Sequence, residues 1–314
     1  MFTSAGNSAT PTTGQSHYAG RMVTRSSGLV VAVLGAGAMG QPMARRLLRA
    51  GHTVWVYDTH DTAVQALPRA IHRASSARQA ADAASGVIGC LPTLAAYRRA
   101  VLGRHGLCHG QAVRLYLHVG TTGAPTAAHL AAELAKRGID TLDAPMTGGP
   151  ARMANGTLSV ITAGSNAARR RAKPVLQSYA SQWVHVGDTV GLAQALKVHN
   201  NLLYIGNLLL ASESLLAAKH AGLAMPQVLE LLASGSGQNW VTSHMVPRHV
   251  LTGGFDFGAN LGMLRKDMAA ACEEFERLGL DAPMTRMVQR RLRQALREWG
   301  EDDDVTAVFK PLRR

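Results

Sequence analysis

Short apolar runs alternate with amphipathic segments between residues 29 and 186 of the chain. The runs that predict strands cover residues 30–34, 53–57, 87–90, 115–119, 139–144, 159–163 and 183–186. Between them, segments such as 41–50 and 124–137 repeat apolar positions at helical spacing. This alternation is typical of an α/β domain with a doubly wound parallel sheet.

The strand pattern stops near Gly191, and the rest of the chain predicts helices. Their expected ranges are 193–220, 226–232, 239–249, 260–278 and 283–299. The first is apolar on several faces, as expected of a helix buried between two domains or two subunits. We therefore predict an α/β domain over residues 29–189 and an all-helical domain over residues 190–314, preceded by a tail over residues 1–28.

The composition of the chain predicts a soluble, cytoplasmic protein. Residues 1–28 are rich in Ser, Thr, Gly and Ala and lack both acidic residues and the apolar core of a secretory signal, which predicts a disordered tail. The richest apolar stretch, residues 202–210, is too short and too interrupted to span a membrane. Cys90, Cys108 and Cys272 are widely spaced, which suits a reducing compartment and neither a disulfide framework nor a metal site.

The formal net charge of +13 raises the alternative of a noncatalytic protein that binds DNA. A clustered basic face would favour that alternative. The basic residues are instead spread along the whole chain, often as pairs such as Arg45 with Arg46 and Arg290 with Arg291. We therefore do not expect a nucleic acid partner.

Three glycines follow the first predicted strand and precede the first predicted helix. Gly35 permits a tight turn, Gly37 lets backbone amides approach a pyrophosphate, and Gly40 allows the helix to pack closely on the strand. Asp58 ends the second predicted strand at about the spacing at which an acidic residue binds the ribose hydroxyls of NAD. Its charge favours NAD over NADP, although NADP stays possible, and the alternative is that Asp58 only ends the strand in a turn.

Four sequence blocks together resemble the β-hydroxyacid dehydrogenases, the family of 3-hydroxyisobutyrate dehydrogenase and tartronate semialdehyde reductase. They are residues 35–44 (GAGAMGQPMA), 143–149 (DAPMTGG) with 156–158 (GTL), 191–201 (GLAQALKVHNN) and 264–268 (LRKDM). The chain departs from the usual family pattern at Thr147 and Thr121, where serine is usual, and at Ala193, where glycine is usual. These departures bear on the substrate more than on the reaction.

The resemblance implies a Rossmann dinucleotide-binding domain, a helical second domain that pairs into a homodimer or homotetramer, and a site for a small carboxylate substrate. The residues implied at the cofactor are Gly35, Gly37, Ala38, Met39, Gly40, Asp58, Leu91, Pro92, Thr121 and Lys266. Those implied at the substrate are Thr122, Thr147, Gly148 and Gly149, with the glycine loop offering backbone N–H groups to the carboxylate. No metal is expected.

Oxidation of a 3-hydroxy acid needs a group that takes the hydroxyl proton and stabilises the developing oxyanion. Lys197 lies on an apolar helix, where burial would lower its pKa toward the working pH. Asn201 follows one helical turn later and faces the same side. The block around Lys197 therefore predicts this pair as catalytic, whereas without the resemblance Lys197 would simply extend to solvent. His199 points to another face, and we expect it to be structural.

The closest competing enzyme class is the imine reductases, which resemble this family in fold but lack a lysine at the catalytic position. Lys197 and Asn201 argue against that class. The 6-phosphogluconate dehydrogenases share this lysine and asparagine but have a much longer C-terminal half. The sequence therefore predicts an NAD(P)-dependent 3-hydroxyacid dehydrogenase with an unidentified acid as substrate.

Overall fold

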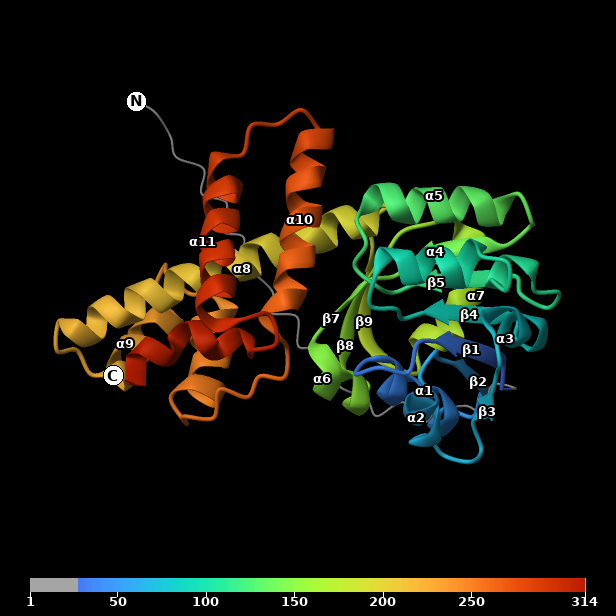
Figure 1. Ribbon diagram of the computed structural model, residues 1–314, viewed down its shortest axis with the longest axis horizontal. Coiled ribbons are helices and arrows are strands. Elements are labelled where there is room, and N and C mark those ends of the chain that lie inside the picture. The colour runs from blue at the N-terminus through green and yellow to red at the C-terminus, as the bar shows by residue number, and fades with distance from the viewer. Residues whose placement is uncertain (1–27, 314) are drawn as a thin grey trace, which may run out of the picture.

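The computed structural model describes residues 28–313, so the expected disordered tail lies outside the described residues apart from Gly28. The described chain has two lobes, one built around a parallel sheet and one made of helices (Figure 1). The expected fold class, a Rossmann-like N-terminal part followed by a helical C-terminal part, is confirmed.

The main sheet has six strands, all parallel, in the order β3-β2-β1-β4-β5-β6. The strands are β1 (Val30–Leu34), β2 (Thr53–Tyr57), β3 (His72–Arg73), β4 (Gly86–Gly89), β5 (Leu115–His118) and β6 (Asp140–Asp143). The intervening helices are α1 (Gly40–Arg49), α2 (Asp61–Gln65), α3 (Ala77–Ala83), α4 (Leu94–Leu102), η1 (Leu107–His109) and α5 (Ala124–Ala135). The order reverses between β1 and β4, which is where a dinucleotide binds in such sheets.

Side chains of the central strands alternate between two apolar layers, because successive strand residues point to opposite faces of a sheet. Val31 and Val33 of β1 pack in the layer that contains α1, α2, α6 and α7. Ala32 and Leu34 pack in the layer that contains α3, α4 and α5. Strands buried on both faces read as continuous apolar runs, which explains why they are recognisable in the sequence.

A second, three-stranded sheet follows the main sheet, in the order β7-β8-β9. Its elements are β7 (Met146–Thr147), α6 (Gly149–Asn155), β8 (Leu158–Thr162), α7 (Asn166–Leu176) and β9 (Ala180–His185). The sequence pattern does not predict this separation, because β8 and β9 have the same apolar character as the strands of the main sheet. The two-residue strands β3 and β7 also escape prediction, since they are too short to carry a periodic signal.

The helical lobe has its own apolar core. Its elements are α8 (Leu192–His220), α9 (Met225–Ser234), η2 (Val241–Val250), α10 (Leu261–Arg277), α11 (Pro283–Trp299) and η3 (Val305–Arg313). The segment η2 is a π-helix where the sequence predicts an ordinary helix, and it contains Pro247, which has no backbone N–H to donate. The final helix η3 is not predicted from the sequence.

Helix α8 spans 29 residues and runs from the sheet lobe through the helical lobe (Figure 1). Among the described residues it is the one helix long and apolar enough to match a membrane span. It packs against α10, α11 and η3, and it carries Lys197, Glu213 and Lys219. These contacts account for its buried apolar residues, which belong to the core of the helical lobe, whereas Leu196, Leu203 and Leu210 stay exposed.

The buried carboxylate of Asp143 joins the two lobes. One carboxylate oxygen accepts hydrogen bonds from the backbone N–H groups of Gly191 (3.1 Å) and Gln194 (3.0 Å), at the start of α8. The other oxygen accepts from the Gln194 side-chain amide at 2.8 Å. Burial raises the pKa of Asp143 to about 6, while these hydrogen bonds oppose that rise. The carboxylate is therefore charged at neutral pH. Its negative charge interacts favourably with the partial positive charge at the N-terminus of α8.

We predict that Asp143→Asn lowers the free energy of unfolding by about 1–3 kcal/mol, because an amide N–H would replace an acceptor that faces N–H donors. The measurement is urea unfolding followed by tryptophan fluorescence. The matched control is Asp140→Asn on the same strand, which removes only a surface ion pair with Arg171 (2.8 Å) and should cost at most about 1 kcal/mol. Equal losses in the two variants would contradict the bridging role of Asp143.

Candidate active site

The turn between β1 and α1 requires glycine at two positions. Gly35 has φ +98°, and a Cβ atom there would lie 2.2 Å from the carbonyl oxygen of Cys90. A Cβ atom on Gly40 would lie 1.8 Å from the carbonyl oxygen of Gly35. The first glycine therefore permits the turn, and the last allows α1 to start directly against it.

Gly37 differs because it faces open space. It is exposed, and a Cβ atom there would meet nothing within 4 Å. Ala38 and Met39 follow before α1, which has no side-chain cap, and the backbone N–H groups of Ala38, Met39 and Gly40 have no hydrogen-bond partner in the described part of the chain, whereas the Gln41 N–H donates to the carbonyl of Gly37 at 3.1 Å. An open glycine beside an uncapped helix N-terminus fits the pyrophosphate of NAD(P).

Asp58 lies beside this turn, at the end of β2. Its Oδ2 atom accepts a hydrogen bond from the backbone N–H of Ala36 (2.6 Å), and its Oδ1 atom accepts one from the backbone N–H of His60 (2.8 Å). Burial works to raise the pKa of Asp58, but these hydrogen bonds and the nearby His60 outweigh burial and keep its pKa below the ordinary value. Asp58 therefore supports the glycine turn as a charged carboxylate.

The loop after β4 reaches the same turn. The side chain of Leu91 comes within 3.2 Å of the Cβ position of Gly35, and Pro92 follows on the surface. The hydroxyl of Tyr97 accepts a hydrogen bond from the backbone N–H of Leu91 (3.1 Å) and donates one to the carbonyl of Gly89 (2.8 Å). This buried tyrosine therefore holds Leu91 beside the glycine turn.

Lys197 lies on the second turn of α8 and is only 8% exposed. Burial lowers its pKa, and the charge of Lys266 lowers it further, while the charge of Asp267 acts in the opposite direction. The net shift is downward, toward a neutral amine that can accept a proton. Gln194 and Asn201 are three and four residues away on the helix, so all three side chains share one face.

Helix α10 brings Lys266 and Asp267 to this face. The Asn201 amide donates a hydrogen bond to Asp267 at 2.6 Å, and the Lys266 ammonium lies 3.6 Å from the same carboxylate. Burial raises the pKa of Asp267, while Lys266, Lys197 and the hydrogen bond from Asn201 oppose that rise. Two lysines and one aspartate thus meet where the helical lobe approaches the sheet lobe.

The loop after β5 completes the site from the sheet lobe. The Lys266 ammonium donates a hydrogen bond to the carbonyl of Thr121 at 3.0 Å. The backbone N–H of Thr122 donates to the side-chain carbonyl of Gln194 at 2.8 Å. The structure therefore brings Thr121, Thr122 and Lys266 together with the face of α8 that carries Lys197.

The remaining predicted substrate residues lie where the first strand of the second sheet leads into α6. Thr147 ends β7, Gly148 precedes α6 with φ +127°, and Gly149 begins that helix with φ +71°. The neighbouring strand β8 contacts α8. No hydrogen bond in the described part of the chain joins this loop directly to Lys197, so its part in the site stays a prediction.

Sequence reasoning missed three residues that organise the site: Asp143, Gln194 and Asp267. Gln194 had a detectable signal, because it lies three residues before Lys197 on the same helical face. Asp267 was visible only as the neighbour of Lys266.

His199 packs edge-on against the ring of Phe275, which agrees with a structural role. Among residues 28–313, no group of three His, Cys, Asp or Glu side chains is placed to hold a metal ion.

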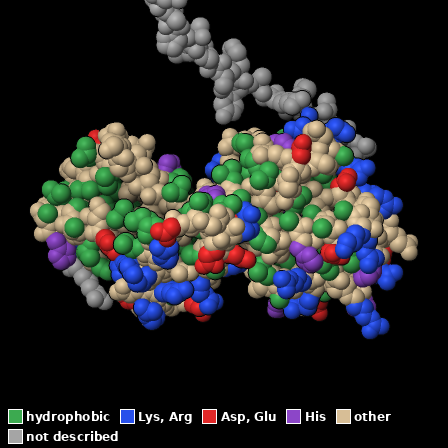
Figure 2. Space-filling view, turned by 90° about the horizontal axis from the view of Figure 1, so that it is seen from above, with side chains coloured by type: hydrophobic (Ala, Val, Ile, Leu, Met, Phe, Trp, Pro, Cys, Tyr) green, Lys and Arg blue, Asp and Glu red, His purple; other side chains and the backbone are tan. Residues whose placement is uncertain are grey.

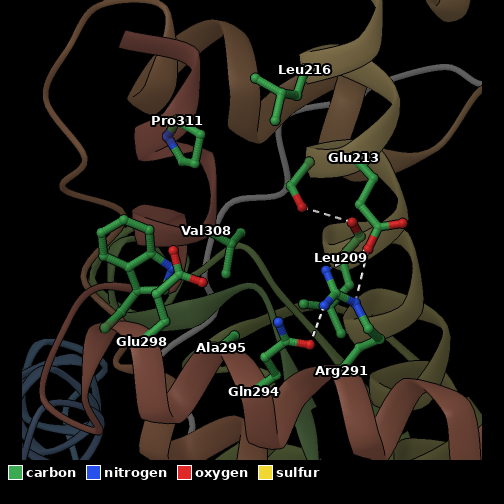
Figure 3. Close-up of a pocket in the computed structure, with 11 residues that line it drawn as sticks. Leu209, Glu213, Leu216, Arg291, Gln294, Ala295, Glu298, Val308 and Pro311 are labelled. Atoms are coloured by element: carbon green, nitrogen blue, oxygen red, sulfur yellow. Dashed lines mark hydrogen bonds and ion pairs between the residues drawn. The ribbon is translucent and has the colours of Figure 1, made fainter. Parts of the chain in front are cut away.

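A hollow of about 120 Å³ in the helical lobe lies between α8, α11 and η3 (Figure 3). Its wall includes an ion pair between Glu213 and Arg291 at 2.6 Å, and it is also lined by Trp299 and Pro311. Its residues on α8 begin at Leu209, more than three helical turns beyond Lys197. This hollow is therefore separate from the candidate active site.

Comparison with known proteins adds independent findings. A family model described as the NAD binding domain of 6-phosphogluconate dehydrogenase matches residues 30–187. A second, described as NAD-binding of NADP-dependent 3-hydroxyisobutyrate dehydrogenase, matches residues 191–312. Together the two models account for both lobes.

The chain is 33% identical to a 3-hydroxyisobutyrate dehydrogenase of Pseudomonas aeruginosa, over 81% of this chain and 88% of the relative. A structure of the Mycobacterium tuberculosis 3-hydroxyisobutyrate dehydrogenase with L-serine has a TM-score of 0.82 and 27% identity, covering 91% and 100% of the two chains. The fold is also similar to that of an imine reductase of Myxococcus stipitatus. The TM-score is 0.60 and the identity 18%, covering 91% of this chain and 99% of that chain, so this similarity shows the fold alone.

The glycine turn generates a paired prediction. Gly37→Ala should leave the unfolding temperature unchanged, because its Cβ meets no atom, but should weaken NAD binding roughly tenfold by losing about one hydrogen bond to the pyrophosphate. Gly40→Ala should instead cost about 1–3 kcal/mol of stability through overpacking against Gly35. Thermal unfolding and calorimetric titration with NAD measure both effects. Loss of stability in Gly37→Ala with unchanged affinity would contradict the assignment.

Proposed function

The chain belongs to the 3-hydroxyisobutyrate dehydrogenase family of NAD(P)-dependent hydroxyacid dehydrogenases, and on that basis we propose that it interconverts a small 3-hydroxy acid and its 3-oxo acid or semialdehyde. The observation that carries this proposal is the buried Lys197, whose lowered pKa and position at the junction of the lobes suit proton transfer. We further propose the division into domains at residues 29–189 and 190–314.

The cofactor site is proposed on the turn between β1 and α1. Gly35, Gly37 and Gly40, with the amides of Ala38 and Met39, would hold the pyrophosphate, and Leu91 and Pro92 would lie beside the cofactor next to this turn. When bound, NAD(P) supplies the hydride acceptor for alcohol oxidation. The charge of Asp58 would repel the 2′-phosphate of NADP, so we propose a preference for NAD. The ribose hydroxyls of NAD would donate to the same carboxylate that already accepts hydrogen bonds from the backbone N–H groups of Ala36 and His60.

Lys197 is proposed to take the hydroxyl proton of the substrate during oxidation and to return it during reduction. In its protonated form it also stabilises negative charge on the same oxygen. Asn201 shares its helical face, and Asp267 holds the Asn201 amide in place. Thr122 and the loop of Thr147, Gly148 and Gly149 are proposed to bind the substrate carboxylate, and Lys266 with Thr121 to close the site over the cofactor.

Two rival functions are less well supported. Imine reductases share the fold, but the pairing of Lys197 with Asn201 favours an alcohol substrate. DNA binding would be favoured by a single basic face, whereas on the face that Figure 2 shows, Lys and Arg side chains lie on both lobes with acidic side chains among them. The relatives named above are metabolic enzymes, and the free cysteines of the described chain suit a cytoplasmic location.

We also propose that α8 pairs two copies of the chain. Leu196, Leu203 and Leu210 recur every seven residues along this helix and are 44%, 68% and 66% exposed. That spacing places them in one stripe on a helix surface. Large exposed apolar side chains that share one face of a helix are characteristic of an interaction surface, and a homodimer or homotetramer would cover them.

The experiment that tests the function is a spectrophotometric screen for NADH formation with a panel of small 3-hydroxy acids, and for NADH consumption with their semialdehydes. Each reaction is repeated with the NADP couple. Turnover of a 3-hydroxy acid with a higher kcat/KM for NAD than for NADP supports both the reaction and the role of Asp58. Binding of NAD without turnover of any member of the panel would count against the proposed reaction.

Lys197→Ala should bind NAD with unchanged affinity and lose roughly 10²–10⁴-fold in kcat, the usual contribution of a positioned acid/base. Lys197→Arg should lose nearly as much, because arginine keeps its proton at any working pH. For the natural enzyme, kcat/KM for oxidation should rise with pH until Lys197 is neutral, at a pKa below its ordinary value.

Lys219→Ala is the matched control for these variants. Lys219 lies on the same helix but donates a hydrogen bond to the carbonyl of Leu312, at the far end of the helical lobe. It should keep the kcat of the natural protein. Normal turnover by Lys197→Ala would show that another group carries the proton.

The proposed pairing predicts that Leu203→Glu with Leu210→Glu reduces the oligomer to monomers in size-exclusion chromatography with light scattering. Two buried carboxylates would face each other across a twofold interface at high cost. The control is Leu231→Glu on α9, a leucine that is 71% exposed and lies outside the stripe. A natural protein that is already monomeric, or dissociation by the control alone, would contradict the proposal.

A further inference from the structure

A row of buried polar side chains leads from the middle of β5 to Thr122. The Tyr116 hydroxyl lies 3.1 Å from Nδ1 of His118, and Nε2 of His118 lies 2.7 Å from Oγ1 of Thr122. Tyr116 and His118 have no exposed surface, and Thr122 is 6% exposed. The apolar run over residues 115–119 hides this row in the sequence.

His118 is a neutral imidazole in this environment. Its ring contacts those of Tyr97 and Tyr116, whose centroids are 4.6 and 5.8 Å away. Burial, together with the charge of Lys266, lowers its pKa to about 3. A neutral imidazole has one N–H donor and one acceptor nitrogen, so its two hydrogen bonds run in one direction along the row.

The Tyr116 hydroxyl decides that direction. It points at Gly89, where a Cβ atom would lie only 2.3 Å from the hydroxyl oxygen, so glycine makes room for it. Among the described residues, its hydrogen-bond partner is His118 alone. The phenol proton is therefore satisfied only if Tyr116 donates to Nδ1 of His118. Nε2 then carries the imidazole proton and donates it to Thr122.

The opposite direction leaves the phenol proton of Tyr116 buried without an acceptor, which costs about 1–3 kcal/mol. In the favoured direction, the Thr122 oxygen receives a hydrogen bond from His118, so its own proton is available to another acceptor. The described part of the chain offers Oγ1 of Thr122 no partner besides His118. That proton is therefore left for a ligand.

Thr122 lies next to the residues proposed to bind the substrate and carry the proton. Its backbone N–H is held by Gln194, one turn before Lys197, and the carbonyl of its neighbour Thr121 is held by Lys266. We infer that Tyr116 and His118 fix the direction of the Thr122 hydroxyl so that it donates its proton to a carboxylate oxygen of the substrate. This inference rests on the proposed function and makes Tyr116 and His118 positioning residues.

The direction is measured without turnover. In protein labelled with ¹⁵N at histidine, the two ring nitrogens of a neutral imidazole differ in chemical shift according to which one carries the proton. The signals of His118 are identified by their loss in His118→Gln. A proton on Nε2 and a bare Nδ1 are expected, and a proton on Nδ1 would overturn the inference even if the enzyme is active.

The kinetic consequence is measured with a hydroxy acid that the natural enzyme turns over. His118→Leu should raise KM for that acid about tenfold, the value of one hydrogen bond to a charged group. The Kd for NAD should not change, and kcat should change less than KM. His118→Gln should recover most of the loss, because its amide nitrogen can donate to Thr122 in place of Nε2, and it remains informative if the leucine variant does not fold.

A double-mutant cycle isolates the shared path. Thr122→Val should raise KM by a similar factor, and His118→Leu should add little in that background, because both changes remove the same hydrogen bond. An unchanged KM in a folded His118→Leu, or a weaker Kd for NAD in place of a higher KM, would overturn the inference. Absence of turnover by the natural protein would instead count against the proposed function, and the NMR result would still decide the direction.

Discussion

The carboxylate of Asp143 is the contact on which the arrangement of the site depends. It lies at the end of the last strand of the main sheet and accepts three hydrogen bonds from the first residues of α8. Removing a charge from water is costly unless N–H donors surround it, and here the backbone of a helix start provides two of them. The two lobes are therefore joined by a bond that only a particular placement of α8 can make.

Gln194 extends this contact into the site. Its side chain donates to Asp143 and to the carbonyl of Gly120, and its own carbonyl accepts from the backbone N–H of Thr122. One amide therefore sets the position of the β5 loop relative to α8. Lys197 follows one turn later, so its distance from Thr122 is decided by the same group.

Much of the sheet lobe could be predicted from the sequence because its signals are local. The glycines at positions 35 and 40 are required by the backbone itself, Gly37 follows the same local spacing, and the buried strands read as apolar runs. The lysine of the site was identified through a family block, since a lysine on an apolar helix has no distinctive signal alone. The site as a set of residues remains a prediction, although the structure gathers Lys197, Asn201, Lys266, Thr121 and Thr122.

What could not be predicted depends on contacts between distant residues. Asn201 meets Asp267 across 66 positions, and Gln194 meets Thr122 across 72. His118 lies in an apolar strand, where its polar partners become visible only when the chain is folded. For the same reason, the sequence does not predict that β7, β8 and β9 form a separate sheet. Apolar runs specify strands and not the sheet that each strand joins.

The length of α8 has a mechanical consequence for any opening of the cleft. Gly187 and Gly191, with φ of +147° and +108°, precede the helix and would suit a hinge, yet Asp143 anchors the first turn beyond them to the sheet lobe. Lys197 therefore travels with the sheet lobe, whereas Lys266 and Asp267 belong to α10 and can move away only by bending α8 or sliding along it. Opening would thus separate the ammonium of Lys266 from Thr121 while leaving the amine of Lys197 in its place relative to the sheet lobe.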